Sequence, residues 1–428
     1  MTLDLLRIST AGSVDDGKST LIGRLLYDTK SILQDQLDHV TQASERRGGE
    51  GVLDLALLTD GLRAEREQGI TIDVAYRYFA TPNRRFIIAD CPGHQQYTRN
   101  MATGASTADL AVILIDARNG VVEQSKRHAF ISALLGIPKL VVAVNKMDLV
   151  DHSQARFEEL ARDFEQFAPN LRRDGQRAGQ HHEIIYIPIS ALNGDNVVDP
   201  SQAMDWYRGP TLLDLLEQVE VAYDHPHDRP ARFPVQWVIR PSSGPERDYR
   251  GYAGQLASGA LRQGDEVTVL PGGERTRIAA IDTYEGELDE ALAPMSVALR
   301  LQDEIDISRG ELICHPEREP LVARELRADV CWMAQKPLRP GGRYLLKQTT
   351  RTATAIVDEI DDVVDVHTLE RDPPPPQLAL NDIGRVRLRT STPLVFDPYK
   401  SNRRTGSFIL IDESSNGTVG AGMIVGSP

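Results

Sequence analysis

The sequence predicts an α/β domain with a mostly parallel sheet, followed by two antiparallel β-barrel domains. Short apolar runs alternate with helical periodicity in the first half, as in parallel sheets that carry helices on both faces. The second half shows short alternating segments between Gly and Pro turns, which is typical of small barrels. Prolines at 222–230 and 316–320 interrupt the pattern, so we expect domains at 1–224, 225–319 and 320–428.

The expected elements follow from these patterns. In the first domain, short apolar runs predict the strands Leu5–Ala11, Phe86–Asp90, Leu110–Asp116, Leu140–Asn145 and Ile184–Ser190. Apolar residues at helical spacing predict the helices Ser19–Leu26, Glu123–Leu135 and Ser153–Phe167. Alternation predicts the barrel strands Val235–Ile239, Gly251–Leu256, Glu266–Leu270, Arg277–Ile281 and Val297–Leu301.

The composition is that of a globular protein that does not attract polyanions. Of the 428 residues, 41% are hydrophobic and 26% are charged, and the formal net charge is −14. An acidic surface repels a phosphate backbone, so we expect no nucleic-acid partner. We see no signal peptide and no apolar run long enough to span a bilayer, so we expect no membrane association. Three cysteines without a CxxC pair predict reduced thiols and a cytoplasmic location.

The first motif, Gly-x-x-x-x-Gly-Lys-Ser, follows a predicted strand and opens a predicted helix. Its glycines let backbone N–H groups turn inward around phosphate oxygens, and the helix N-terminus adds positive potential. We expect Lys18 to reach the β- and γ-phosphates of a nucleoside triphosphate and the Ser19 hydroxyl to bind Mg²⁺. The binding residues predicted here are Gly12, Ser13, Val14, Asp15, Asp16, Gly17, Lys18, Ser19 and Thr20.

A second motif, Asp90-Cys91-Pro92-Gly93, ends the next apolar strand. Alone it is a short match, and a structural Asp at a strand end would explain it. Because it follows a phosphate loop, we expect Asp90 to hold Mg²⁺ through water and the Gly93 N–H to contact the γ-phosphate.

Two further loops predict that the base is guanine. The motif Asn145-Lys146-Met147-Asp148 ends a strand, and the Asp148 carboxylate can accept hydrogen bonds from guanine N1–H and the exocyclic amine, a donor pair that adenine lacks. We expect Asn145 to tie this loop to the phosphate loop, and Lys146 to lay its stem over the purine ring. Ser190-Ala191-Leu192 ends the last strand, where the Ala191 N–H would meet guanine O6; this tripeptide gains weight only from its position.

Two residues are the candidate catalytic groups. Thr71 is the candidate switch residue, whose hydroxyl and carbonyl would cap Mg²⁺ and the γ-phosphate only with GTP bound; the alternative is an ordinary strand residue. His94 follows Gly93 and is expected to orient the attacking water, although a histidine can also be structural. Val14 and Ile70 would form an apolar gate over it. Together the motifs predict an α/β P-loop GTPase domain with GTP and Mg²⁺ as ligands.

The motif residues resemble those of a known class of GTPases. The first 220 positions resemble the translation-factor class of GTPases, the group of elongation factor Tu, through residues 69–71, 90–94 and 145–148. That class usually carries His at the positions of Ser13 and Asp16, where this chain departs. With these departures, the chain resembles the large GTP-hydrolysing subunit, subunit 1, of bacterial sulfate adenylyltransferase. The resemblance covers essentially the whole chain and is carried by residues 12–28, 65–76, 97–106 and 128–136.

The resemblance implies a GTPase that pairs with a smaller, adenylyl-transferring catalytic subunit in a heterodimer or higher assembly. Together the subunits would make adenosine 5′-phosphosulfate and pyrophosphate from ATP and sulfate in sulfate assimilation, and GTP hydrolysis would drive this uphill reaction. Some relatives carry a fused kinase, but no second phosphate loop occurs here, so we expect none. The sequence also lacks Ser-Gly-Gly-x-Asp-Ser and His-x-Gly-His motifs, so we expect adenylyl transfer on another chain.

Two other functions stay open at this point. One is a translation factor that acts with tRNA or the ribosome, against which the acidic charge and the altered Ser13 and Asp16 argue. The other is a GTP-dependent regulatory or scaffold module without a metabolic reaction. His94 favours real hydrolysis over such a module but does not identify the reaction that hydrolysis drives.

Overall fold

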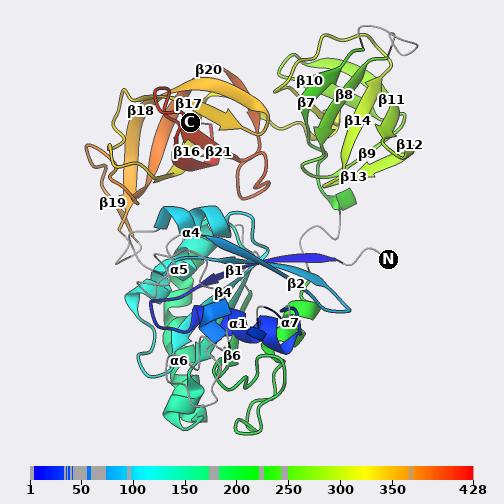
Figure 1. The fold of residues 1–428 in the computed structure, drawn as a ribbon. Coiled ribbons are helices and arrows are strands. Elements are labelled where there is room, and N and C mark those ends of the chain that lie inside the picture. The colour runs from blue at the N-terminus through cyan, green and yellow to red at the C-terminus, as the bar shows by residue number, and fades with distance from the viewer. Residues whose placement is uncertain are drawn as a thin grey trace. The chain divides into compact units, whose positions relative to one another are not determined.

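The computed structural model describes residues 4–32, 35, 37, 38, 41, 55–58, 74–93, 98–172, 183–220, 226–241, 249–365, 368 and 370–427. The chain forms two compact units, which divide between residues 221 and 222. Unit 1 is built from strands and helices, whereas unit 2 is built almost entirely from strands (Figure 1). The division into three domains at 224/225 and 319/320 remains a prediction.

Unit 1 is organised around one sheet, in the order β2-β3-β1-β4-β5-β6. All neighbouring strands pair in parallel except β2, which is antiparallel to β3 at the edge. Every residue of β4 is buried, which requires cover on both faces and confirms the predicted sheet. The strands are β1 Leu5–Ala11, β2 Ala75–Ala80, β3 Arg85–Asp90, β4 Leu110–Asp116, β5 Lys139–Asn145 and β6 Glu183–Pro188.

Helices connect the strands of unit 1. Helix α1 buries Leu21, Ile22, Leu25 and Leu26, which is the apolar face that the sequence predicted. Ser153 caps α6, where its hydroxyl accepts a hydrogen bond from the Arg156 N–H at 3.3 Å. The helices are α1 Lys18–Asp28, α4 Thr98–Ala105, α5 Glu123–Leu134, α6 Gln154–Phe167 and α7 Leu212–Gln218, with 3₁₀ turns η1 Leu55–Leu58, η3 Met147–Val150 and η4 Ala168–Arg172.

One strand and two α-helices among the described elements of unit 1 were not predicted: β2, α4 and α7. Strand β2 carries aromatic and charged residues and is exposed on alternate positions, so it does not read as a buried run. Helix α7 spans only two turns, but a local signal existed, because Thr211 and Asp214 form a capping box at its start.

The topology brings the predicted motifs to one edge of the sheet. After β1 the chain forms the edge strand β2 and then β3 on one side of β1, and it next crosses to β4 on the other side of β1. In open α/β sheets, ligands bind outside the carboxyl ends of the strands where the winding reverses in this way. The loops that follow β1, β3, β5 and β6 meet at that edge, and these are the loops that hold the four motifs.

Unit 2 contains two seven-stranded antiparallel sheets, each closed into a barrel, and a separate two-stranded antiparallel sheet of β13 and β9. The order β10-β15-β7-β8-β14-β11-β12 is closed by pairing of β10 with β11, and the order β17-β21-β22-β16-β20-β18-β19 is closed by pairing of β17 with β18. Each barrel has its own core, around Phe233 and Tyr252 in the first and around Trp332 and Phe396 in the second. The two predicted barrels are thus confirmed (Figure 1).

The strands of the first barrel are β7 Phe233–Ile239, β8 Gly251–Gln255, β9 Ala260–Arg262, β10 Glu266–Leu270, β11 Glu274–Thr283, β12 Gly286–Leu288, β13 Glu290–Leu292, β14 Ser296–Leu301 and β15 Leu312–Cys314. Those of the second are β16 Leu321–Trp332, β17 Arg343–Gln348, β18 Arg351–Val364, β19 Arg371–Asp372, β20 Ile383–Phe396, β21 Ser407–Ile411 and β22 Thr418–Gly426. The prolines that predicted boundaries begin the 3₁₀ turns η5 Pro226–Asp228 and η6 Pro316–Arg318.

Two further sequence-based expectations can be compared with the structure. The cysteines Cys91, Cys314 and Cys331 are all buried. Within the described ranges, no helix combines the length and the apolar character that a membrane crossing requires.

Candidate functional site

The loop between β1 and α1 is a tight turn that closes on itself. The Ser13 N–H donates to Asp16 Oδ2 at 2.5 Å, and the Asp16 N–H donates to the Ser13 carbonyl at 3.3 Å. Gly17 has a φ of 93°, and a β-carbon there would lie 2.4 Å from Asn145 Nδ2. This position therefore requires glycine, and helix α1 begins at the next residue with its N-terminus at the carboxyl edge of the sheet.

Lys18, the first residue of α1, is a buried cation whose side chain reaches back to the loop. Its Nζ donates to the carbonyl oxygens of Gly12 and Ser13, both at 2.9 Å. Burial lowers the pKa of Lys18, while the nearby carboxylates of Asp90 and Asp16 act in the opposite direction. An ammonium has three donors, and these two carbonyls account for two, so Lys18 is arranged to bind an anion at the mouth of the loop.

The β3 loop packs directly against the phosphate loop. Asp90 is 2% exposed, and its Oδ1 accepts a hydrogen bond from Thr10 Oγ1 at 3.2 Å. A β-carbon on Gly93 would lie 2.5 Å from the Gly12 carbonyl oxygen and 2.7 Å from Lys18 Nζ. The structure thus brings Asp90, Cys91, Pro92 and Gly93 beside the phosphate loop, as the motif predicted.

The sequence also predicts a switch residue, a hydrolytic residue and an apolar gate over the latter. Thr71, His94 and Ile70 lie outside the residues that the structure describes. Val14, the other residue of the predicted gate, is 37% exposed on the phosphate loop.

Asn145 joins the phosphate loop to two loops of the predicted base site. Its side chain is 2% exposed; Nδ2 donates to the Asp16 carbonyl at 2.7 Å, and Oδ1 accepts from the Ala191 N–H at 2.9 Å. The expected tie between Asn145 and the phosphate loop is therefore present. The Ala191 N–H, which we expect at guanine O6, is directed at Asn145, and its contact with a base stays a prediction.

Asp148 and Lys146 extend this arrangement at the end of β5. The Ser190 hydroxyl donates to Asp148 Oδ1 at 2.7 Å and so orients the carboxylate that we expect to read guanine. Lys146 Nζ donates to the Asp15 carbonyl of the phosphate loop and lies 2.9 Å from Asp116 Oδ2. Met147 is buried, so it supports the loop from beneath.

Three residues that the sequence reasoning missed also hold the base end together. Asp116 and Arg118 form a bidentate ion pair after β4, with distances of 2.7 and 3.1 Å. Arg24 of α1 donates from Nε to the Ala191 carbonyl at 3.2 Å and from Nη2 to the Leu192 carbonyl. Asp116 had a signal, because it ends a strand at the same edge as Asp90 and Asn145. Nothing in the helical pattern marks Arg24.

The arrangement suits a ligand with a phosphate chain at one end and a base at the other. The phosphate loop, Lys18 and the N-terminus of α1 offer positive charge and backbone donors, which favour phosphate. The loops after β5 and β6 offer the Asp148 carboxylate, a match for the donors of guanine. Asn145 and Lys146 each contact both regions, so the two ends are held at a fixed separation.

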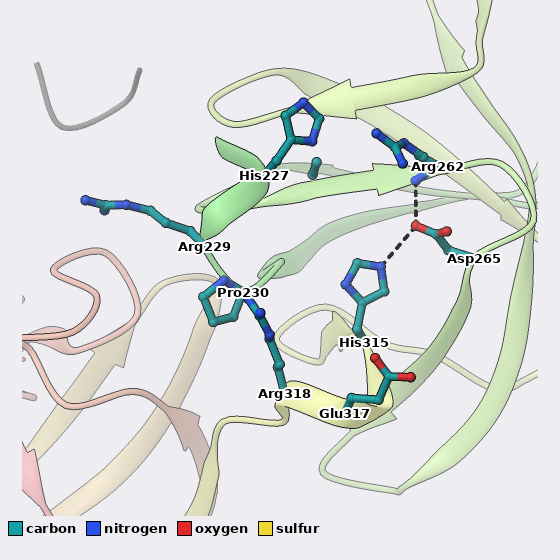
Figure 2. Close-up of a pocket in the computed structure, with 9 residues that line it drawn as sticks. His227, Arg229, Pro230, Arg262, Asp265, His315, Glu317 and Arg318 are labelled. Carbon is teal, nitrogen blue, oxygen red and sulfur yellow. Dashed lines mark hydrogen bonds and ion pairs between the residues drawn. The ribbon is translucent and has the colours of Figure 1, made fainter. Parts of the chain in front are cut away.

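A separate cavity of about 380 Å³ lies in the first barrel of unit 2 (Figure 2). Two of its charged groups have partners: His315 Nε2 lies 3.0 Å from Asp265 Oδ2, and Arg262 Nε donates at 2.7 Å to Glu290, which lies outside the lining. No predicted site residue lines it. The lining residues are His227, Arg229, Pro230, Ala260, Arg262, Asp265, His315, Glu317 and Arg318.

Comparison with known proteins first defines the class. The family model of the elongation factor Tu GTP-binding domain matches residues 3–222, and that of the GTP-eEF1A C-terminal domain-like family matches residues 325–425. The first match covers just over half of the chain and includes the phosphate loop and the linked loops after β5 and β6. The chain therefore belongs to the elongation factor Tu class of GTP-binding proteins.

Closer relatives narrow the class. Sulfate adenylyltransferase subunit 1 of Bacteroides fragilis is 52% identical over 99% of this chain and 86% of its own length. That of Erwinia tasmaniensis is 54% identical over 98% of this chain and 86% of its own length. The bifunctional enzyme CysN/CysC of Mycobacterium tuberculosis is 56% identical over 98% of this chain and 67% of its own length. This chain belongs to the family of sulfate adenylyltransferase subunit 1.

Proposed function

We infer that this chain is the GTPase subunit of a two-subunit sulfate adenylyltransferase. In this enzyme, GTP hydrolysis drives formation of adenosine 5′-phosphosulfate and pyrophosphate from ATP and sulfate. The observation that carries the GTPase part is the Asn145 side chain, which joins a phosphate loop to the loop of Ser190 and Ala191. The sulfate reaction rests on the relatives at 52–56% identity.

Binding of GTP uses the two ends of the site. Lys18 and the N-terminus of α1 neutralise the triphosphate, and the phosphate loop wraps it with backbone donors. Asp148, oriented by the Ser190 hydroxyl at 2.7 Å, accepts from guanine N1–H and the exocyclic amine. Adenine lacks this donor pair, so the chain binds GTP in preference to the ATP that its partner consumes.

The residues present also fit Mg²⁺. Ser19 lies in the first turn of α1, and the buried Asp90 lies across the loop beside Lys18. Mg²⁺ typically takes one or two protein oxygens together with phosphate oxygens and water, so a hydroxyl and one carboxylate suffice. When bound, the ion neutralises charge that develops on the β- and γ-phosphate oxygens. Ser19 and Asp90 would hold it, and Thr71 would complete the set.

His94 is the proposed hydrolytic residue. It directly follows Gly93, whose position against Lys18 and the Gly12 carbonyl leaves no room for a side chain. A side chain one residue further on can orient a water molecule toward the γ-phosphate. Thr71, as the switch residue, would report the presence of that phosphate to residues around it.

The partner is a smaller subunit that transfers the adenylyl group. The mixed phosphoric–sulfuric anhydride of adenosine 5′-phosphosulfate is high in energy, so its formation from ATP and sulfate is uphill and needs a second exergonic reaction. The single guanine-type site described on this chain supplies GTP hydrolysis and leaves the adenylyl chemistry to the partner. A cytoplasmic location remains our expectation for both.

A reconstitution tests the proposal. The chain is purified with the smaller subunit encoded in the same organism, and adenylylsulfate is measured with ATP and sulfate, with and without GTP. We expect synthesis that depends on GTP and that fails with the Lys18→Ala chain, whereas Lys139→Ala, a surface control, behaves as the wild type. Binding to tRNA or ribosomes, without sulfate-dependent GTP turnover, would establish the translation-factor alternative instead.

The role of His94 has its own test. His94→Ala is expected to slow GTP hydrolysis by roughly 100-fold or more while the Kd for GTP stays within about twofold, since the residue acts only on the attacking water. Equal loss of GTP binding and of turnover would show that His94 is structural.

A further inference from the structure

Asp116 occupies a place at the base end that none of the predicted motifs covers. It ends β4, and its side chain is 1% exposed. The carboxylate lies 2.9 Å from Lys146 Nζ and accepts two hydrogen bonds from the Arg118 guanidinium, at 2.7 and 3.1 Å. The Arg118 backbone N–H adds a fourth contact at 2.9 Å. Both carboxylate oxygens are therefore fully engaged.

The backbone around Asp116 is held in place independently of these side chains. The Ala117 N–H donates to the Asn145 carbonyl at 2.9 Å, which ties the turn after β4 to the base loop. The Asn119 and Gly120 N–H groups both return to the Asp116 carbonyl, at 3.1 and 2.9 Å. Arg156 of α6 adds a bond from Nε to the Ala117 carbonyl at 2.8 Å. The carboxylate is thus presented from a rigid turn.

Lys146 needs such support. Its φ of 63° lies in the left-handed region, which a long side chain rarely adopts without compensating contacts. Its ammonium has two partners, the Asp116 carboxylate and the Asp15 carbonyl of the phosphate loop. Burial raises the pKa of Asp116, but the hydrogen bonds from Arg118 and Lys146 outweigh it and hold that pKa well below its usual range. The carboxylate therefore stays ionised beside Lys146.

We propose that Asp116 is a positioning residue of the nucleotide site, which fixes Lys146 between the purine face and the phosphate loop. This inference rests on the proposed function, because it assigns the base to the loop of Asp148. Asp116 acts through Lys146: it sets the direction of the Lys146 stem, which packs on the face of the ring. The face is common to all purines, whereas Asp148 reads the edge.

The distinction between face and edge supplies the test. Dissociation constants are measured for GDP and for inosine 5′-diphosphate, which lacks the exocyclic amine of guanine. Asp116→Asn removes the charge with little change of shape. We expect it to weaken both nucleotides by about 10- to 100-fold, as for loss of a charge-assisted contact, and to leave their ratio unchanged.

A second variant keeps the test decisive if Asp116→Asn folds poorly. Lys146→Met retains the aliphatic stem and removes the ammonium, and it should weaken both nucleotides to a similar extent. The double variant should bind each nucleotide at most about threefold more weakly than the more strongly affected single variant does. The two losses should not add, because the two residues act through one contact. Additive losses would show that Asp116 acts through the fold, and a changed GDP-to-IDP ratio would overturn the assignment to the ring face.

Asp109→Asn is the matched control. Asp109 sits before the other end of the same strand, where its carboxylate accepts from the Arg7 N–H at 3.0 Å. We expect no change in GDP affinity for this variant, with melting temperatures recorded for all chains. Wild-type affinity in Asp116→Asn would refute the positioning role, whereas failure of the wild-type chain to bind GDP would instead refute the proposed GTPase function.

Discussion

The phosphate end and the base end of the nucleotide site are built in different ways. At the phosphate end, the backbone forms the site, and glycines at 17 and 93 have no room for a β-carbon. At the base end, side chains form the site, because Asn145, Lys146 and Ser190 join loops that are far apart in the sequence. A phosphate chain needs many donors in a small space, whereas a base needs one correctly aimed acceptor.

The difference predicts how each end responds to substitution. The phosphate end should be sensitive to added atoms and to loss of the buried cation Lys18. The base end should be sensitive to changes in hydrogen-bonding character at constant size. Each of the following variants tests one side of this comparison.

Lys18→Ala should have the largest effect. It removes the ammonium that binds phosphate and takes away a cation that lies near both Asp90 and Asp16. We expect GTP and GDP affinity to fall by roughly 100- to 1,000-fold, corresponding to about 3 to 4 kcal/mol. Calorimetric titration measures this, with Lys139→Ala, a partly exposed lysine paired with Glu183, as the control. A loss of less than tenfold would show that the backbone donors alone hold the phosphates.

Asp148→Asn should change the kind of base that binds. The amide keeps an oxygen for the Ser190 hydroxyl but replaces an acceptor with a donor. We expect GDP to bind about 10- to 100-fold more weakly, and xanthosine 5′-diphosphate, which has a carbonyl in place of the amine, to bind more tightly.

The nearby exposed Asp151 provides the comparison for this change, and Asp151→Asn should leave both affinities unaltered. If Asp148→Asn weakened both diphosphates equally, the base end would not be read through this carboxylate.

Gly93→Ala tests the steric character of the phosphate end. The added methyl group would lie 2.5 Å from a backbone oxygen, that of Gly12, so two loops must separate. We expect a loss of about 2 to 3 kcal/mol in the free energy of unfolding of unit 1, measured by denaturant titration. Gly426→Ala, which has no heavy atom within 4 Å of its added carbon, should be neutral. Equal stability of the two variants would contradict the close packing.

The buried His128 should make the free energy of unfolding depend on pH. This side chain of α5 is 2% exposed, and burial, together with the charges of Lys18 and Arg127, lowers its pKa to about 3. The unfolded chain takes up this proton near pH 6.5, so the folded state loses stability as pH falls from there toward 3. We expect the contribution of His128 to unfolding free energy to be about 2 kcal/mol less favourable at pH 5 than at pH 7.

His128→Gln should remove that part of the pH dependence. His227→Gln, at a half-exposed position in unit 2, should leave the slope as it is in the wild type. An unchanged slope in His128→Gln would mean that His128 does not stay neutral in the folded protein.

Much of this site could be predicted because its motifs are local. Gly12 to Ser19 form one turn and a helix start, and the strand ends at Asp90 and Asn145 are marked by apolar runs that stop at a polar residue. A parallel sheet places such strand ends at one edge, so the order of the motifs implied a common site. The same reasoning overlooked Asp116, although it stands at an equivalent strand end, since it belongs to none of the four sequence motifs.

The sequence by itself determined the fold class, the class of nucleotide and the positions of the loops that surround it. These depend on periodicity and on glycine, which act over a few residues. Only the tertiary structure decided which partners the side chains choose: Arg24 with the carbonyl of Ala191, Asn145 with that of Asp16, and Lys146 with Asp116. A hydrogen bond acts over about 3 Å, so these pairings could be found only after the sheet had placed distant loops side by side.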